Sequence, residues 1–237
     1  MNLRKSKEIS FKYINDPGGA RIKNCFNIIF LGVLTVTYFD KNEDFVHIFQ
    51  CHFLKNGIMT DTKVGVSFID FETRLANQLL QLNYPDIVEY IYNPLSYAIS
   101  PHTDFVEKYA NSTPKPVMFL GMNPGPWGMA QTGVPFGEVQ LVKNWLGICG
   151  KVEKPDVEHP KKPIKGFSSS RREVSGERFW TFFSKICKTP EVFFRNCIVY
   201  NHCPLVYMNK SGKNLTPPDL SIQARNQVLT LCDQVRP

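Results

Sequence analysis

The stretch PVMFLGMNPGPWGMAQTGVPFG, Pro116 to Gly137, decides the fold of this chain. Its first part, Pro116–Gly121, is a short apolar run that ends in glycine, a pattern typical of a buried strand that opens into a loop. A second run, Cys197–Tyr200, ends in the polar pair Asn201-His202 in the same way. Both runs are therefore predicted to be strands whose carboxyl ends carry loops.

Helical patterns precede and separate these two strands. Apolar residues recur at mostly helical spacing in Phe68–Leu82, and helices are also predicted over Val139–Ile148 and Ser175–Ile186, the last with Ser175 as a possible cap. Alternating strands and helices predict a parallel α/β sheet, in which ligand sites lie outside the carboxyl ends of the strands. The two polar strand ends are thus expected to face one crevice.

Glycines and prolines punctuate the segment Gly121–Gly137, named here the Gly121–Gly137 motif. Backbone of this composition can approach a ligand closely and hold one fixed shape. The motif lacks the lysine of a P-loop and the spacing of a dinucleotide fingerprint, so phosphate cradling is not indicated. A purely structural turn is the alternative interpretation.

Charge and size favour one globular unit with an anionic partner. The chain has 237 residues, 28 Lys+Arg against 21 Asp+Glu, a net charge of +7 and a pI near 9.0. Clustered cations release counterions from a phosphate backbone, which makes nucleic acid a natural partner. The Pro-rich segment Lys151–Arg172 has no acid after Pro160. It is either a solvated loop or a phosphate contact.

The sequence does not favour a disulfide-bonded, metal-binding or membrane protein. Seven scattered cysteines without a CxxC pair indicate reduced thiols, and His202-Cys203 lacks a second pair at zinc-finger spacing, so no metal is expected. The apolar run Cys25–Phe39 is too short to span a bilayer and is better interpreted as a buried strand. No membrane association is expected. Residues 1–65 show no recognisable motif and are predicted to be an appendage of unknown structure.

The Gly121–Gly137 motif resembles that of the single-strand-selective monofunctional uracil-DNA glycosylases, within the uracil-glycosylase superfamily. The likeness runs from about Val66 to Arg236. It continues through these further segments: Ile91-Tyr-Asn-Pro-Leu-Ser-Tyr-Ala98, Glu138-Val, Trp145-Leu-Gly, Glu158-His-Pro-Lys-Lys-Pro, Glu173-Val-Ser-Gly-Glu-Arg-Phe-Trp180, Pro190-Glu-Val-Phe-Phe194, Asn201-His-Cys-Pro-Leu205 and Ser211-Gly-Lys-Asn-Leu-Thr-Pro217.

The resemblance implies a three-layer α/β/α fold with a short parallel central sheet. It implies hydrolysis of the N-glycosidic bond of uracil, and of oxidised derivatives such as 5-hydroxymethyluracil, in single- and double-stranded DNA. That reaction initiates base-excision repair in the nucleus, by a monomer without a cofactor. The absence of lysine from the Gly121–Gly137 motif fits a monofunctional mechanism without a Schiff base.

Family positions imply the roles of individual residues. Asn123 matches the asparagine that positions the attacking water, which suits a reaction that needs no strong base. Asn201 matches the amide that reads the uracil edge, since an amide can donate to O4 and accept from N3–H. Phe136 matches the residue that stacks on the flipped base, Met122 a backbone contact to it, and Gly125 a position that leaves room near C5.

A DNA-contacting region is implied farther along the chain. It covers Ser211–Arg225, where Thr216-Pro-Pro-Asp resembles a helix cap. The residues assigned to DNA contact are Ser211, Gly212, Lys213, Asn214, Thr216 and Arg225.

Two departures from the family qualify these expectations. The chain ends at Pro237, before the family's His-Pro-Ser-Pro type loop, so a truncated domain over residues 66–237, incomplete at its carboxyl end, is expected. Strands Val117–Leu120 and Ile198–Tyr200 would then be short of neighbouring strands. Tyr200 stands where a histidine is expected. The alternatives to an active enzyme are an impaired isoform that only binds DNA, and a chain without a stable fold.

Overall fold

The structure is a computed structural model that describes residues 33–39, 45–52, 64–110, 115 and 117–233. Its main sheet has four strands in the order β1-β2-β4-β5. The predicted apolar runs form β4, Val117–Gly121, and β5, Cys197–Asn201. They pair in parallel, with Gly121 opposite Asn201, so the two carboxyl ends meet at one edge as predicted.

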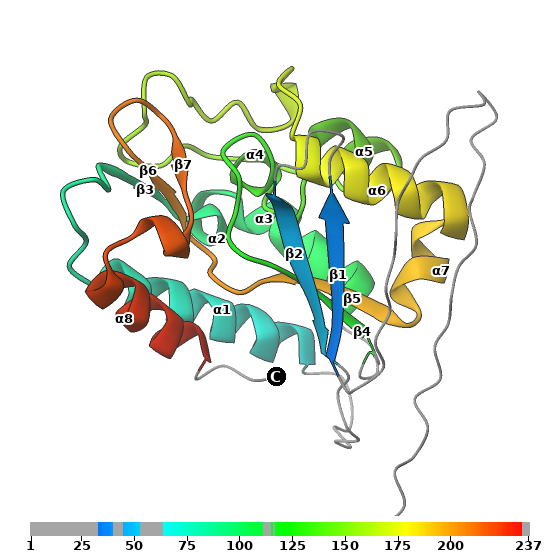
Figure 1. Cartoon of the computed structure of the whole chain (residues 1–237). Coiled ribbons are helices and arrows are strands. Elements are labelled where there is room, and N and C mark those ends of the chain that lie inside the picture. Colours follow the sequence, from blue (N-terminus) through cyan, green and yellow to red (C-terminus); the bar gives the residue numbers. More distant parts are fainter. Residues whose placement is uncertain (1–32, 40–44, 53–63, 111–114, 116, 234–237) are drawn as a thin grey trace, which may run out of the picture.

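An antiparallel hairpin extends the sheet on the other side of β4. It consists of β1, Val33–Phe39, and β2, Phe45–His52, and β2 pairs with β4 at Gln50↔Leu120 (Figure 1). The strand expected within Cys25–Phe39 is thus present as β1, and residues 25–32 of that run lie outside the described residues. The expectation that Val117–Leu120 would be short of neighbouring strands is wrong, because β2 occupies that side.

Helices cover both faces of the parallel pair. On one face lie α6, Val174–Cys187, and α7, Pro190–Phe194, whose aromatic rings pack with Phe119 and Val199 in one core. On the other face lies α1, Val64–Leu80, with α8, Ile222–Asp233, beside it (Figure 1). The predicted α/β class with a short parallel pair is confirmed, and helices on both faces are consistent with three layers.

A second, antiparallel sheet of order β3-β6-β7 adjoins α1 and α8 through shared apolar residues. Its strands are β3, Tyr90–Tyr92, β6, Val206–Met208, and β7, Asn214–Leu215. Strands β6 and β7 follow β5 along the chain, whereas β3 precedes β4. The segment after Asn201 returns to the Gly121–Gly137 motif, because Leu205 and Leu215 accept hydrogen bonds from Asn123.

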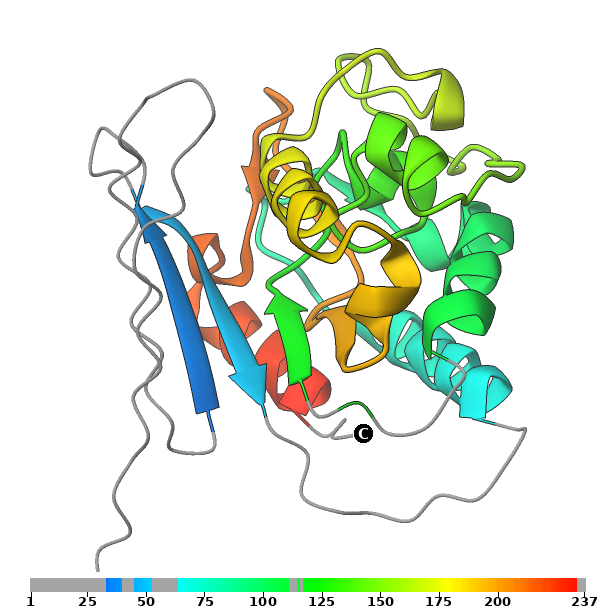
Figure 2. The same cartoon turned by 90° about the vertical axis from the view of Figure 1, so that its right-hand side faces the viewer.

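Short helices complete the fold around the motif, and Figure 2 shows them grouped to one side of the main sheet. Before β4 lie α2, Pro94–Tyr97, α3, Ile99–Phe105, and a π-helical turn, Val106–Ala110. Within and after the motif lie α4, Met129–Thr132, and α5, Val139–Asn144. Turns of 3₁₀-helix cover Gly166–Ser168 and Pro217–Asp219.

The predicted helices exist with changed ends. The helix expected over Val139–Ile148 ends earlier, at Asn144 in α5. Helix α6 is capped by Glu173, whose carboxylate accepts from Ser175 and Gly176 N–H, so the prediction of Ser175 as the cap is wrong. A carboxylate at this position also favours the helix dipole. No helix among the described residues is both long and apolar enough to cross a membrane.

Candidate active site

The carboxyl ends of β4 and β5 bring a glycine and an asparagine into contact. Gly121 lies so close to Asn201 that a Cβ at Gly121 would stand 2.2 Å from Asn201 Oδ1 and 3.0 Å from Phe136 Cζ. Glycine is required here because any side chain would displace both neighbours. The two strand ends thus lie side by side as predicted, and Phe136 packs against them; the crevice itself stays a prediction.

Asn201 presents its amide at the end of β5. Its side chain is 6% exposed, and Nδ2 donates to the thioether of Met129 at 3.1 Å. A thioether is a weak acceptor, so a carbonyl oxygen of a bound ligand would be a stronger partner for this N–H. The amide is thus buried and held, and its hydrogen-bonding capacity is only weakly used.

Phe136 is held in an unusual backbone conformation beside this amide. Its φ is 54°, in the left-handed region that phenylalanine rarely adopts. Its ring stacks on Phe179 of α6, with centroids 4.8 Å apart and planes at 17°. Such outliers persist only where surrounding contacts enforce them, and they cluster at functional sites. The ring is half-buried, which suits a stacking surface next to Asn201.

Asn123 is oriented by two main-chain carbonyls. Its Nδ2 donates to Leu205 O at 3.3 Å and to Leu215 O at 3.1 Å. Two carbonyl acceptors identify the amide nitrogen and turn the oxygen, Oδ1, the other way. The side chain therefore offers a fixed acceptor, which is what holding a water molecule for attack requires.

Met122 and Gly125 lie on the same loop with different surroundings. Met122 is 42% exposed, and its carbonyl accepts from Cys203 N–H at 2.9 Å, which ties the motif to the residues after β5. A Cβ at Gly125 would meet Glu173 at ordinary contact distances, 3.7 Å from Cγ. Space at Gly125 is therefore bounded by the first turn of α6.

Glu173 is a structural residue of this site that the sequence reasoning did not single out. A Cβ at Gly128 would stand 2.7 Å from Glu173 Cγ, and a Cβ at Gly176 would stand 2.0 Å from the Phe136 carbonyl. The first turn of α6 thus lies between two parts of the Gly121–Gly137 motif. The sequence feature that could have indicated this contact is the segment Glu173-Val-Ser-Gly, in which the small residues Ser175 and Gly176 come shortly after an acid.

The predicted DNA-contact residues 211–214 lie in the turn and second strand of the β6–β7 hairpin, and Thr216 caps the 3₁₀ turn that follows it. Asn209 organises the turn, since its Oδ1 accepts from Ser211 N–H, Ser211 Oγ–H and Lys213 N–H at 2.7 to 3.0 Å. Gly212 has φ 84° and lies against the His159 ring. Because Leu215 of this hairpin holds Asn123, the hairpin and the candidate catalytic residue are adjacent.

Other residues of this region have intramolecular partners. Thr216 and Asp219 form a capping box, and Lys213 Nζ lies 3.3 Å from Asp219 Oδ1 on the surface. An exposed ion pair contributes little, so a phosphate could compete for Lys213. Asn214 Oδ1 is buried without a hydrogen-bond partner among the described residues. Arg225 lies on α8, half-buried and outside the hairpin.

A buried ion pair contacts the Gly121–Gly137 motif through the main chain of Gly133. His102 Nε2 lies 2.6 Å from Glu72 Oε2, and His102 Nδ1 lies 2.8 Å from the carbonyl of Gly133, within the Gly121–Gly137 motif. An ionised Glu72 carboxylate and the Gly133 carbonyl are both acceptors, so the protonated imidazole, which donates from both ring nitrogens, is the form that satisfies both contacts. Burial alone lowers the pKa of His102, but the Glu72 charge and these hydrogen bonds outweigh burial and raise it above 6.5.

Tyr200 precedes Asn201 and has no polar partner for its hydroxyl among the described residues. Its ring contacts Phe68 of α1 edge-on, with centroids 5.7 Å apart. Burial raises the pKa of Tyr200 well above its ordinary value, so the hydroxyl is neutral. Tyr200 packs into the layer beneath the site, and it is not itself a titrating group.

No cluster of three or more metal-ligating side chains occurs in the described part of the chain. The groups that meet at the site are two amides, an aromatic ring and main-chain groups. Such a set can bind a planar, uncharged heterocycle by its edge and face, and can hold a water molecule beside it.

Curated relatives match 166 residues of this chain, which is 70% of its length. They come from rat, mouse and cattle, with identities of 54%, 53% and 52%. The chain spans about three fifths of the length of these relatives, 59% to 61%. No protein-family model matches the chain.

The relatives are uracil-DNA glycosylases, and at these identities the matched part of the chain is homologous to that class. More particularly, all three are named single-strand selective monofunctional uracil-DNA glycosylase, and the matched part of this chain is 52–54% identical to them. The resemblance expected from the sequence motifs is thereby confirmed. Among solved structures, wild-type SMUG2 from Pedobacter heparinus aligns with a TM-score of 0.45 and 20% identity, over 69% of this chain and 67% of that one.

Proposed function

We propose that the protein is a monofunctional DNA glycosylase that hydrolyses the N-glycosidic bond of uracil in DNA. The observation that carries the proposal is the convergence of Gly121, Phe136 and Asn201 at the ends of β4 and β5, next to an oriented Asn123. Its relatives, as named, act on uracil in DNA. The two amides and the aromatic ring of this site support the proposal.

Two side chains, the Phe136 ring and the Asn201 amide, would recognise the base. Phe136 offers a ring for stacking on a flipped base, a contact worth about 1–3 kcal/mol per base in single-strand binding. Asn201 can donate from Nδ2 to uracil O4 and accept the N3 hydrogen at Oδ1. Cytosine presents an amino donor and an unprotonated N3, so it would oppose both contacts.

Hydrolysis requires little acid or base from the protein. A water held at Asn123 Oδ1 attacks C1′ of the deoxyribose, the C1′–N1 bond breaks, and its electron pair leaves with the uracil anion. The proton of the water passes to solvent, and the products are free uracil and an abasic site. Asn123 acts by position, and loss of such a group typically lowers the rate by about 10²–10³.

The finer substrate range is part of the proposal. Gly125 has no side chain, and the space beside it is bounded by Glu173, which supports acceptance of a small substituent at C5, as in 5-hydroxymethyluracil. We extend the proposal to uracil in single- and double-stranded DNA, to a monomeric protein and to a nuclear location in base-excision repair.

A second candidate function is DNA binding without excision. Lys161, Lys165, Arg171 and Arg172 are exposed on a segment without acids, which supports salt-sensitive binding that does not depend on the base pocket. The two functions differ in one product, the abasic site.

The discriminating experiment uses an end-labelled single-stranded oligonucleotide with one deoxyuridine, followed by hot alkali to cut at abasic sites. We expect cleavage by the unchanged protein and a rate about 10²–10³ lower for Asn123→Ala. Asn144→Ala, on the exposed end of α5, is the matched control and should retain the rate. If the folded protein gives no cleavage at enzyme excess, excision is excluded and DNA binding alone remains.

A further inference from the structure

Two cations lie against one aromatic ring of the Gly121–Gly137 motif. Lys162 Nζ stands 4.7 Å from the centroid of the Trp127 ring, and Arg171 Cζ stands 5.7 Å from the same centroid. Both distances are within the range of cation–π attraction. The three residues come from separate parts of the chain, so the fold gathers them beside the loop that forms the base pocket.

Neither Lys162 nor Arg171 forms an ion pair with an acid among the described residues. Residues 160–172 contain no acid. In the described part of the chain, the cation of this segment that forms an ion pair is Arg172, with Glu177. Burial lowers the pKa of Lys162, and the positive charge of Arg171 lowers it further. Two like charges at one ring repel each other, and an anion placed between them would relieve that repulsion.

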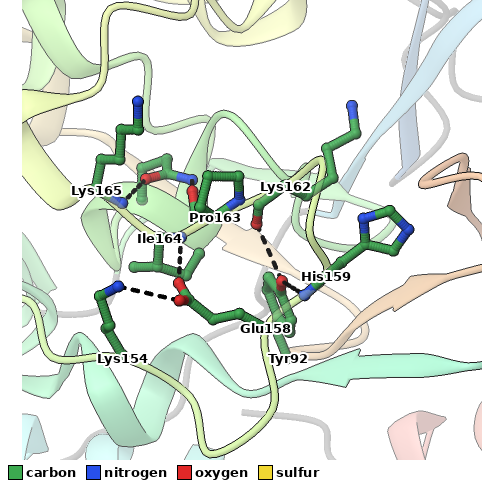
Figure 3. A network of polar contacts seen from close by, with 9 residues as sticks. Tyr92, Lys154, Glu158, His159, Lys162, Pro163, Ile164 and Lys165 are labelled. Carbon is green, nitrogen blue, oxygen red and sulfur yellow. Dashed lines mark hydrogen bonds and ion pairs between the residues drawn. The ribbon is translucent and has the colours of Figure 1, made fainter.

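The backbone beneath Lys162 is fixed. Its N–H donates to the His159 carbonyl at 2.9 Å, and its own carbonyl accepts from Tyr92 Oη at 3.0 Å. In Figure 3 the Tyr92 hydroxyl lies beneath the Lys162 carbonyl, and the Lys162 side chain extends in the opposite direction. The ammonium group is therefore presented outward from a rigid base.

A buried glutamine joins this loop to the Gly121–Gly137 motif. Gln131 Nε2 donates to Pro126 O at 2.9 Å and to Pro163 O at 3.2 Å, while its Oε1 accepts from Lys165 N–H at 2.8 Å. The residues next to Trp127 and Lys162 thus share one partner. A contact assembled in advance loses less entropy on binding, so this arrangement favours a ligand at a fixed distance from the base pocket.

We propose that Trp127, Lys162 and Arg171 form a binding site for the phosphodiester backbone of the DNA strand whose flipped base enters the pocket. The ligand class follows from the proposed function, on which this inference rests. An ammonium and a guanidinium supply charge and directed donors for phosphate oxygens, and Trp127 holds both in place. Aromatic rings among cations are characteristic of single-strand binding surfaces.

The test is the salt dependence of binding to a labelled single-stranded oligonucleotide without uracil, measured between about 50 and 200 mM salt. Each lost phosphate contact reduces the slope of log affinity against log salt by about 0.7. We expect Lys162→Ala with Arg171→Ala to reduce it by about 1.4, so that this variant loses about seven-fold less affinity than the unchanged protein across the range.

The matched control removes two positive charges from a surface away from Trp127. Lys143→Ala with Lys185→Ala takes two exposed cations from the last turns of α5 and α6, and should leave the slope unchanged. Thermal unfolding of each variant shows that it is folded. Equal loss of slope in both double variants would mean that only total charge matters, and an unchanged slope in the Lys162/Arg171 variant would exclude the contact.

Excision of uracil, measured separately, keeps this inference distinct from the proposed function. A reduced slope in a protein that cannot excise uracil would support the phosphate contact and overturn the enzyme proposal. An unchanged slope in a protein that excises uracil would overturn the contact and leave the enzyme proposal intact.

Discussion

Substitution of Glu72 tests how the fold supports the base pocket. Glu72 and His102 are 3% and 1% exposed and form an ion pair. The second ring nitrogen of His102 contacts the Gly133 carbonyl. Removing one partner of a buried pair leaves an uncompensated charge and typically costs about 3–5 kcal/mol. We expect Glu72→Gln to lower the free energy of unfolding by an amount toward the lower end of this range, because glutamine retains the shape and a carbonyl oxygen.

The pH dependence of this loss has a definite sign. The pKa of His102 in the folded protein is raised above its ordinary value of 6.5. A raised pKa means that the pair contributes its full stability below pH 6.5 and that this contribution is lost as the pH rises through the folded-state value. The difference in stability between unchanged protein and Glu72→Gln should therefore be largest in mild acid and shrink in alkali.

Chemical denaturation followed by circular dichroism measures the free energy of unfolding of the unchanged protein and of Glu72→Gln. Repeating it from mild acid to alkaline pH gives the pH dependence of the difference. His102→Leu combined with Glu72→Met is the control, because replacing both charges by apolar groups avoids an unpaired buried ion and leaves only the Gly133 carbonyl without its donor, at about 1–3 kcal/mol. A difference between unchanged protein and Glu72→Gln that is constant with pH, or that grows toward alkaline pH, would refute the protonated His102.

Three further predictions concern single residues. Gly121→Ala should cost about 1–3 kcal/mol of stability, because its Cβ would stand 2.2 Å from Asn201 Oδ1. Adding Asn201→Ala should recover most of that loss in thermal unfolding, and strictly additive losses would show that the two residues are not in conflict. Tyr200→Phe should be neutral or stabilising by about 1 kcal/mol, since it removes a buried hydroxyl without a partner; a clear loss of stability would reveal a partner for it. The hydrogen bonds from Thr216 N–H and hydroxyl lower the pKa of Asp219 below 3.8. The capping box therefore stabilises the protein above pH 3.8 and is lost as the pH falls through the lowered value. Asp219→Asn should weaken the acid limb of a stability profile, and an unaltered limb would contradict the role of this carboxylate.

The strand ends could be predicted from the sequence because their signals are local. An apolar run that ends in Gly121 and another that ends in Asn201 identify two strands, and parallel pairing then places both ends at one edge. The side chains of Asn123 and Phe136 gained their roles from the family motif, and the structure adds how each is held.

Features that depend on distant partners could not be predicted. The place of β2 beside β4 depends on strand pairing, which has no counterpart in the apolar pattern of either segment. Glu72 and His102 are 30 residues apart and show no periodic relation. The cap at Glu173 was missed because serine is the commoner N-cap residue, whereas here the glutamate also fills the space left by Gly125 and Gly128.

The most direct test of the central claim is the identity of the base that the folded protein releases. Two single-stranded oligonucleotides that differ by one deoxyuridine or one deoxycytidine would be incubated with the protein, and the free bases would be quantified by mass spectrometry. Recognition of the base by Asn201 and Phe136, as proposed, predicts free uracil from the first oligonucleotide and no free cytosine from the second. Release of both bases, or of neither at enzyme excess, would contradict the account.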